Sequence, residues 1–396
     1  MSARKVSSAK APLVLLAALA VLAAAVLVAG CGGSDDSTSG DTSASGGSTS
    51  GETSGGETSG GADTAAAEEI VQQFNKPMTI QLKKLPKAPP EDVKFVYAAC
   101  SVPSCQSIAE GAIEAGEALG WDTQRVNFTA TGPQEIVQAM DQVVAEKPEV
   151  VGTASISKTE FAEPLEKLAA DEVPVAVASS PDGPGDGIVA NVSGPRVTKI
   201  SGKTIAAYVV AEAGEDANVL MFNIPDFKVL VPFETSFEEE FKSLCPECGY
   251  EAVALTADNI GKDAPTIVTS AFQRNPDANY AVFSFGDITS GVPAALASAG
   301  LDDVKIVGQS PSEPNIAALE SEEEDMWLAK PLATSGWLVV DALARQLTGG
   351  DPAETEFMPA ALQFLTPENI GGEEEQVAYN EVPDNNQVFE ELWDKK

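Results

Sequence analysis

The feature that most constrains the fold of this chain is a repeated unit, in which a short apolar run ends abruptly and a helical pattern follows. The run VKFVYAA (93–99) passes into Cys, Ser and Pro, and the runs at 149–155 and 174–179 also end in polar residues. Apolar, β-branched runs separated by helical patterns indicate parallel strands joined by crossover helices. The sequence therefore predicts an α/β fold of parallel sheets flanked by helices, in which ligands bind where the strands end.

These units fall into two successive sets. The first set has predicted strands at 93–99, 121–128, 149–155, 174–179 and 187–192. The second set begins after Pro195, with predicted strands at 218–224, 250–256, 280–285, 304–308, 325–332 and 360–366. Its predicted helices lie at 197–213, 233–244, 264–274, 292–299 and 334–347. Two such sets predict two α/β lobes whose strand ends face a common cleft.

The charge balance argues against several function classes. The chain has 60 Asp and Glu against 24 Lys and Arg, a net charge of −36, and no His. Such a surface repels phosphate backbones, so a nucleic-acid partner is not expected. The absence of His removes the usual general base and the commonest transition-metal ligand, although Asp, Glu, Lys and Cys remain. We therefore expect no metal, no cofactor and no catalytic residue.

Residues 1–31 have the pattern of a secretion signal. Basic residues at positions 4, 5 and 10 precede an uninterrupted apolar run at 11–30. The run ends in Val-Ala-Gly-Cys, which resembles the bacterial lipobox, where the Cys is lipidated and becomes the mature N-terminus. An uncleaved transmembrane anchor is the alternative, because about eighteen apolar residues suffice to span a bilayer. In both cases the remaining chain lies outside the cytoplasm, and lipidation of Cys31 would anchor it to the outer face of the bacterial cytoplasmic membrane.

A tether follows the signal. Residues 32–64 are almost wholly Gly, Ser, Thr and acidic residues, which predicts a disordered coil that spans on the order of 30 Å. A short helix is predicted at 65–74, and KAPPED (87–92) marks a rigid entry to the folded body. The sequence does not decide whether the N-terminal extension 65–90 packs on the first lobe.

Residues 93–369 resemble the type I periplasmic substrate-binding proteins, the ribose- and galactose-binding class that serves ABC transporters. The segments that carry the resemblance are SVPSCQSIAEG, EALGW, PVAVASS, AVFSFGD, VKIVGQS, LAKPLATSG and FLTPENI. The terminal FEELW (389–393) is similar to a tail seen on these lipoproteins. The ligand domain of LacI-type repressors shares the fold, but the export signal and the lack of a helix-turn-helix argue against that class.

The resemblance implies how the two lobes are assembled. The chain would cross between lobes near Val192–Pro195, Lys330–Leu332 and Gly349–Thr355. The implied parts are lobe one at 91–195 and 333–352, lobe two at 196–332 and 353–370, and a C-terminal tail at 371–396. A small solute would bind between the lobes, hinge closure would trap it, and a monomer would deliver it to an ABC permease.

The resemblance also implies a set of site residues, and most of them depart from the sugar-binding pattern. The matching or neighbouring positions in this chain are Ser101, Ser104, Cys105, Ser179, Ser180, Asp182, Phe227, Phe233, Phe285, Asp287, Ser310 and Lys330. Planar polar groups that pair with sugar hydroxyls are replaced by hydroxyl groups, a glycine or an aromatic ring.

These replacements favour a ligand that is not a plain pentose or hexose. Phe227, Phe233 and Phe285 add apolar surface, and Lys330 adds a cation. We therefore expect a partly apolar ligand with an anionic group paired to Lys330. The alternative is that the Phe rings belong to the core and that Lys330 pairs with a nearby acid.

The four cysteines other than Cys31 form two close pairs. Cys100 and Cys105 flank the first strand–helix turn, and Cys245 and Cys248 form a Cys-Pro-Glu-Cys motif. In an oxidising compartment these pairs predict disulfides. A zinc site or a redox motif is the alternative for Cys-Pro-Glu-Cys, but no His is available and the motif ends a helix rather than opening one.

Two other function classes remain open from the sequence. The fold also suits a sensor that reports ligand occupancy to a membrane kinase or chemoreceptor. In an enzyme, paired acids such as Glu238–Glu240 or Glu322–Asp325 would act as catalytic carboxylates, but dense acidic runs are typical of solvated helix faces. Asp182 and Asp287 are the only acids that we would test for catalysis. No phosphate loop, nucleophile elbow or metal signature is present, so we expect a binding protein and no enzyme.

Overall fold

The computed structural model describes residues 61–76, 79–129, 133–356, 362–370 and 379–395, all within the compact unit Glu57–Lys396. The predicted signal 1–31, Cys31 and nearly all of the predicted tether lie outside the described residues. None of the helices in the described ranges is both long and apolar enough to cross a membrane.

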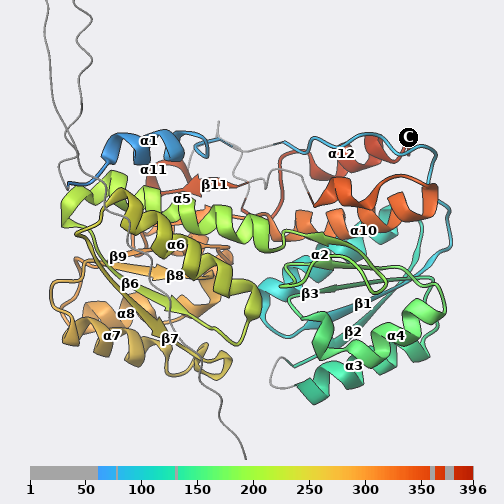
Figure 1. The fold of residues 1–396 in the computed structure, drawn as a ribbon, viewed down its shortest axis with the longest axis horizontal. Helices are drawn as coiled ribbons and strands as arrows, with labels where there is room; N and C mark the ends of the chain where they lie inside the picture. Colours follow the sequence, from blue (N-terminus) through green and yellow to red (C-terminus); the bar gives the residue numbers. More distant parts are fainter. Residues whose placement is uncertain (1–60, 77–78, 130–132, 357–361, 371–378, 396) are drawn as a thin grey trace, which may run out of the picture. The chain divides into compact units, whose positions relative to one another are not determined.

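The first lobe is built on a parallel sheet with the strand order β2-β1-β3-β4-β5. Its strands are β1 (Lys94–Cys100), β2 (Asp122–Phe128), β3 (Val150–Ala154), β4 (Val175–Ala178) and β5 (Ile188–Val192). Its helices are α2 (Pro103–Ala118), α3 (Pro133–Ala145), α4 (Ala162–Ala170) and α10 (Leu332–Thr348). Figure 1 shows α2 and α10 on one side of these strands and α3 and α4 on the other.

The alternation of side chains along β1 explains why both faces of this sheet are covered. Phe95 and Tyr97 are buried against α2 and α10, whereas Val96 and Ala98 are buried against α3 and α4. A strand that is apolar on both faces needs helices on both, which is the arrangement that parallel sheets require. The continuous apolar run in the sequence is therefore a direct consequence of the layer structure.

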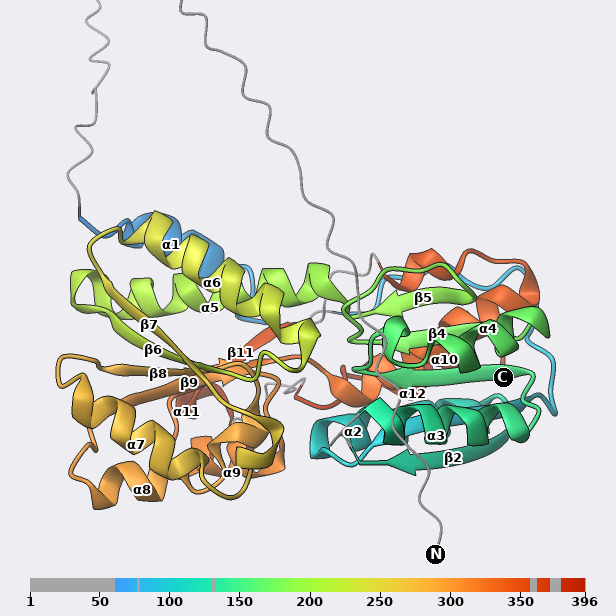
Figure 2. The ribbon, with the colours of Figure 1, turned by 60° about the horizontal axis from the view of Figure 1, so that its bottom comes forward.

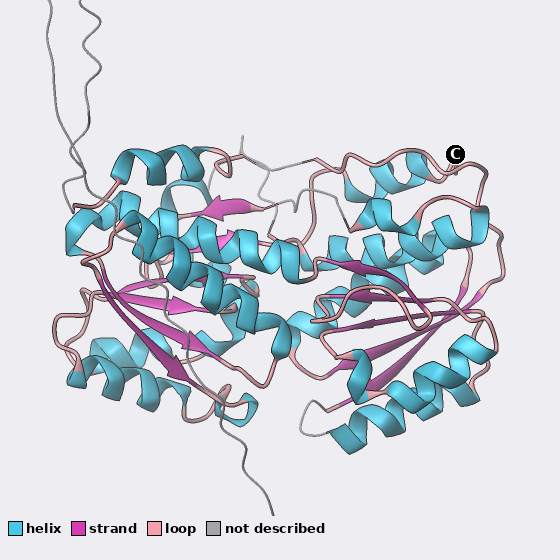
Figure 3. Cartoon of the chain, in the orientation of Figure 1, coloured by secondary structure: helices cyan, strands magenta, loops and turns pink. Residues whose placement is uncertain are grey.

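The second lobe is built on a sheet with the order β11-β10-β9-β8-β6-β7, in which only β11 runs antiparallel to its neighbour among the described strands. Its strands are β6 (Asn218–Asn223), β7 (Gly249–Ala254), β8 (Tyr280–Phe283), β9 (Lys305–Gln309), β10 (Met326–Ala329) and β11 (Gln363–Leu365). Its helices are α5 (Pro195–Ala213), α6 (Val231–Leu244), α7 (Ala264–Arg274), α8 (Val292–Ser298), α9 (Glu313–Glu320) and α11 (Pro367–Ile370). Helices again lie on both faces of the strands (Figure 3). The predicted fold class of two lobes with parallel-dominated sheets is confirmed.

Two helices of the first lobe pack with their backbones in contact. Gly111 of α2 and Gly336 of α10 lie at the crossing, where a Cβ on Gly111 would clash with the carbonyl of Ala333 and one on Gly336 with the carbonyl of Ile108. Glycine is required here because backbone approaches backbone. The close crossing fixes α2, and with it the turn at its N-terminus that reaches the site.

The N-terminal extension packs on both lobes. Its helix α1 (Thr64–Gln72) lies beside α5 (Figure 2), with the amide of Asp63 donating to the carbonyl of Leu244 at 2.7 Å. Further along, Leu85 is buried in the core of the first lobe and its amide donates to Leu392 at 2.9 Å. The sequence left open whether the extension packs on the first lobe. In the structure it packs on the first lobe and on the second.

The C-terminal tail forms α12 (Asn385–Leu392) and packs on α10. Trp393 stacks on Trp337 with 5.5 Å between ring centroids, and its indole N–H donates to Asp341 at 2.8 Å. The FEELW segment therefore contributes aromatic side chains to the core of the first lobe.

Candidate functional site

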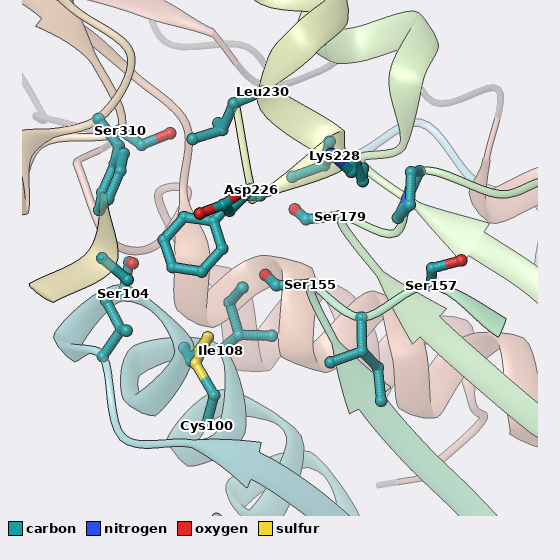
Figure 4. Close-up of a pocket in the computed structure, with 18 of the residues that line it drawn as sticks. Cys100, Ser104, Ile108, Ser155, Ser157, Ser179, Asp226, Lys228, Leu230 and Ser310 are labelled. Carbon is teal, nitrogen blue, oxygen red and sulfur yellow. A yellow bond between two sulfur atoms is a disulfide. The ribbon is translucent and has the colours of Figure 1, made fainter. Parts of the chain in front are cut away.

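A pocket of about 580 Å³ lies where strand ends of both sheets meet. Its walls come from the turns after β1, β3 and β4 of the first lobe and after β6, β7, β8 and β9 of the second, together with the segment between β10 and α10. This is the location at which open α/β sheets bind ligands. Figure 4 shows side chains from these turns around one space.

Three of the pocket serines have a left-handed backbone. Ser155, Ser179 and Ser310 each follow the last residue of a strand and have φ of 63°, 50° and 52°. Residues other than glycine adopt this region at a cost of about 1–2 kcal/mol, and such strain gathers at ligand sites. The sharp turn directs these hydroxyls to the pocket, and the hydroxyl of Ser310 has no hydrogen-bond partner in the described part of the structure.

Lys330 is the buried cation of the site. It is only 7% exposed, and its ammonium donates to the hydroxyl of Ser179 at 3.0 Å and to the carbonyl of Ser193 at 3.5 Å. Burial lowers its pKa to about 8. Among the described residues no carboxylate lies within ion-pair distance of it, so the alternative of a neighbouring acid has no support there.

The aromatic residues of the predicted site divide into two groups. Phe227 and Phe285 line the pocket with their ring centroids 6.1 Å apart and their planes at 63°. Phe233 is 0% exposed and packs with Phe237 beneath α5, outside the pocket lining. The apolar wall of the pocket is completed by aliphatic side chains, among them Ile108 and Leu230.

Asp287 links the two lobes instead of lining the pocket. Its carboxylate, on the turn after β8, accepts hydrogen bonds from the backbone amide and the hydroxyl of Ser104 at 3.2 and 3.0 Å. Ser104 stands in the first turn of α2, where unpaired amides favour an anion. Burial nevertheless raises the pKa of Asp287, with the bonds from Ser104 acting in the opposite direction.

Ser180 and Asp182 hold the loops behind the pocket. Ser180 donates to the carbonyl of Ile156 at 2.9 Å, and Asp182 accepts from the hydroxyl of Ser157 and the amide of Lys158, both at 2.7 Å. Neither side chain lines the pocket. Of the predicted site residues, the pocket brings together Ser101, Ser104, Cys105, Ser179, Phe227, Phe285, Ser310 and Lys330.

The cysteines stand in the two predicted pairs. The sulfur atoms of Cys100 and Cys105 lie at bonding distance in the pocket wall, and those of Cys245 and Cys248 do so in the core of the second lobe. The disulfides themselves stay a prediction. In the described ranges no group of three or more Cys, Asp or Glu is arranged to hold a metal ion.

Several lining residues were not among those predicted from the sequence, including Ser155, Ser157, Asp226 and Gln309. Each stands in or directly beyond the end of a strand or in the turn that follows it. Their position at the strand ends is therefore the sequence signal that predicts them. The sugar-binding pattern does not include them.

Residues 93–351 match the protein family described as periplasmic binding protein domain. The chain belongs to this periplasmic binding protein family. Its predicted relationship to the type I substrate-binding proteins of ABC transporters is confirmed. No curated protein matches the sequence.

Several solved structures of such proteins have a similar fold. A periplasmic ribose ABC transporter from Conexibacter woesei is similar with a TM-score of 0.60 and 18% identity, over 72% of this chain and 95% of that chain. An ABC transporter solute-binding protein from Agrobacterium vitis, bound with α-D-tagatopyranose, is similar with a TM-score of 0.62 and 20% identity, over 74% of this chain and 100% of that chain. A chain of the XylFII–LytSN complex is similar with a TM-score of 0.61 and 15% identity, over 70% of this chain and 99% of that chain. At these identities the likeness concerns the fold.

The periplasmic binding protein family consists of substrate-binding proteins that act outside the cytoplasm with ABC permeases, and not of enzymes. The acidic pairs considered as catalytic carboxylates are Glu238–Glu240 and Glu322–Asp325. Glu240 pairs with Lys203 at 2.8 Å and Asp325 with Lys305 at 2.6 Å, and none of these four side chains lines the pocket.

Proposed function

We propose that this protein is the lipid-anchored, extracytoplasmic solute-binding protein of an ABC importer, and that it captures a partly apolar solute carrying an anionic group. The observation that carries the proposal is Lys330, a buried ammonium in the pocket wall whose only described partners are a hydroxyl and a carbonyl. A buried charge is costly unless it is paired. An anionic ligand group supplies the missing partner, and Phe227 and Phe285 receive the apolar part.

The place of Lys330 in the chain supports capture by closure. Lys330 lies between β10 of the second lobe and α10, which packs on the first lobe, and its ammonium contacts Ser179 of the first lobe. We propose lobes at 91–195 with 333–352 and at 196–332 with 353–370. A ligand bound at Lys330 then contacts both lobes and the segment that joins them, and closure traps it.

The membrane anchor is supported by sequence alone. The apolar run and the Val-Ala-Gly-Cys ending at Cys31 favour lipidation, and the Gly/Ser/Thr-rich stretch that follows favours a flexible tether to the outer face of the cytoplasmic membrane. Metabolic labelling with a radioactive fatty acid tests this, with Cys31→Ser as the control. Label that persists in Cys31→Ser would contradict the anchor.

The ligand class is tested on the full-length protein in detergent by a thermal-shift screen of sugars, aromatic acids, nucleosides and amino acids, because ligand binding raises the unfolding midpoint. We expect an acid to rank first, and Lys330→Met to weaken it about tenfold or more, since a hydrogen bond to a charged group contributes about 1.5–3 kcal/mol. Lys228→Met is the matched control, because Lys228 lines the same pocket but is exposed and donates to its own loop at Pro225. A neutral sugar that ranks first and binds Lys330→Met equally well would contradict the ligand class.

A sensor function is the second candidate. It is favoured by the similarity to a chain of the XylFII–LytSN complex, in which this fold is found with a protein partner. Loss of solute uptake after deletion of the gene supports the importer. Unchanged uptake together with loss of a transcriptional response to the ligand supports the sensor.

A further inference from the structure

The ionisable side chains that line the pocket differ in how they are already engaged. These side chains are Glu160, Asp226, Lys228, Asp258 and Lys330. Glu160 accepts from the amide of Ser157 at 2.7 Å in a capping box, and Asp258 lies 3.9 Å from the ammonium of Lys262. Lys228 donates to the carbonyl of Pro225 at 3.1 Å.

Asp226 is the acid of this group that remains available. In the described part of the structure its carboxylate has neither a hydrogen-bond nor an ion-pair partner, and the neighbouring Lys228 makes no ion pair with it. Asp226 stands on the turn after β6, directly before Phe227. Figure 4 shows its carboxylate directed into the pocket.

The free carboxylate and the buried ammonium reach the pocket from different parts of the fold. Asp226 belongs to the second lobe, whereas the ammonium of Lys330 is held against Ser179 of the first lobe. Apolar side chains, including Phe227 and Phe285, line the same space. A ligand that satisfies both charges therefore carries one positive and one negative group on a partly apolar body.

We propose that the ligand is amphoteric, with a protonated amine facing Asp226 and an acidic group facing Lys330. This inference rests on the proposed solute-binding function and adds Asp226 as the residue that selects the amine. Asp226 is exposed in the ligand-free protein, so ligands that carry only the acid neither gain nor lose at this carboxylate. Amphoteric analogues of the same shape gain a charge-assisted hydrogen bond there and bind more tightly.

The test uses two series of probes that differ only in their charged groups. The first compares L-phenylalanine, which carries acid and amine on the same carbon, with 3-phenylpropionate and phenethylamine. The second compares 4-(aminomethyl)benzoate with 4-methylbenzoate and 4-methylbenzylamine, and places them at opposite ends. Isothermal titration of the full-length protein in detergent gives the affinities. We expect an amphoteric member to bind at least tenfold more tightly than both of its analogues.

Substitutions then assign the amine to one carboxylate. Asp226→Asn is expected to weaken the amphoteric probe at least tenfold and to leave its acid-only analogue within twofold. Asp277→Asn is the control, an exposed acid of the same lobe that lies outside the pocket lining, and it is expected to change neither affinity. Equal losses for the amphoteric and the acid-only probe in Asp226→Asn would overturn the proposal.

The remaining outcomes separate this proposal from the function on which it rests. If the acid-only members bind as tightly as the amphoteric ones, the amine selection fails and the anion-binding site stands. If none of the six probes binds but a neutral sugar does, both charge assignments fail and solute capture stands. If no solute of the wider screen binds, the proposed function fails as well.

Discussion

Ser104 and Asp287 connect the two lobes through a pair of hydrogen bonds to one carboxylate oxygen, at 3.2 Å from the amide and 3.0 Å from the hydroxyl of Ser104. Neither bond requires the ligand, and Asp287 does not line the pocket. Removing the carboxylate in Asp287→Ala therefore weakens the contact between the lobes and releases Ser104, which itself lines the pocket. We expect ligand affinity to fall about tenfold, because a smaller fraction of the protein holds the lobes together.

Two variants make this result specific. Asp287→Asn keeps one acceptor oxygen for Ser104 and is expected to lose less affinity than Asp287→Ala. Asp277→Ala removes an exposed acid of the same lobe and is expected to change nothing. The prediction fails if Asp287→Ala binds ligand as tightly as the wild type and gives the same radius of gyration in X-ray scattering without ligand.

The pH dependence of ligand binding follows from Lys330. Burial lowers its pKa to about 8, so the ammonium that attracts an anion is lost as pH rises through that value. We expect the affinity for an anionic ligand to decrease between about pH 7 and pH 9 in isothermal titrations. Lys330→Arg stays charged over this range, and its affinity is expected to be independent of pH. Parallel profiles for the two proteins would contradict the role of Lys330.

The free energy of unfolding of the ligand-free protein is predicted to change in a definite direction at alkaline pH. The folded-state pKa of Lys330 lies below its ordinary value of 10.5, so between about pH 8 and 10.5 the unfolded chain binds more protons than the folded one. The free energy of unfolding therefore rises with pH in that interval. Relative to Lys330→Met, the wild type is expected to gain stability across it in urea unfolding. A loss of stability there would indicate an acidic partner for Lys330.

The fold could be predicted because buried strands carry their own signal. The predicted strand 174–179 contains β4 (Val175–Ala178), and the helix predicted at 264–274 coincides with α7. Helix α9 (Glu313–Glu320) was not predicted, because it is short, ends in an acidic run and has Pro at its second position. Its start is fixed by a capping box between Ser312 and Asn315, a local signal that hydrophobic periodicity does not detect.

The pocket could be predicted only in part, because a residue's place along the chain does not fix the direction of its side chain. Ser179 and Ser310 follow strand ends and line the pocket as expected. Phe233 is the third residue of α6, and the helical turn rotates its ring beneath α5. Asp226 was not predicted, because its availability to a ligand amine depends on which neighbouring charges already have partners. That is a property of the folded chain.

A buried ion pair in the first lobe is predicted to be essential for stability. Asp341 and Arg345 are separated by one helical turn, are 0% and 2% exposed at their side chains, and lie 2.6 Å apart. Asp341 also accepts from Trp393, so it ties α10 to the C-terminal tail. In Asp341→Ala the guanidinium of Arg345 keeps only the less buried of its two described ion-pair partners, Glu354 at 3.1 Å. We expect a loss of about 3 kcal/mol in the free energy of unfolding.

The matched comparison is the ion pair of Glu163 and Lys167, which has the same spacing of four residues and lies 3.2 Å apart on an exposed helix face. Glu163→Ala is expected to cost less than about 1 kcal/mol. Urea unfolding of both variants at one pH measures the difference. Similar losses in the two variants would show that burial does not govern the contribution of these pairs.

The two cysteine pairs allow a comparison between a disulfide in the pocket wall and one remote from it. A bond between Cys100 and Cys105 closes the turn that presents Ser101 and Ser104 to the pocket, whereas the pair at Cys245 and Cys248 lies in the core of the second lobe. Titration of the unfolded, unreduced protein is expected to find none of these four thiols free, and four free thiols would contradict both disulfides.

Breaking each bond separately then tests its role. In Cys105→Ala the turn after β1 is no longer closed, and the hydroxyl of Ser104 loses its fixed position against Asp287. We therefore expect Cys105→Ala to lower both the unfolding midpoint and the ligand affinity. Cys248→Ala is expected to lower the midpoint alone, since its pair lies outside the pocket lining. If the two variants lose affinity equally, the disulfide in the pocket wall acts through global stability and not through the geometry of the turn.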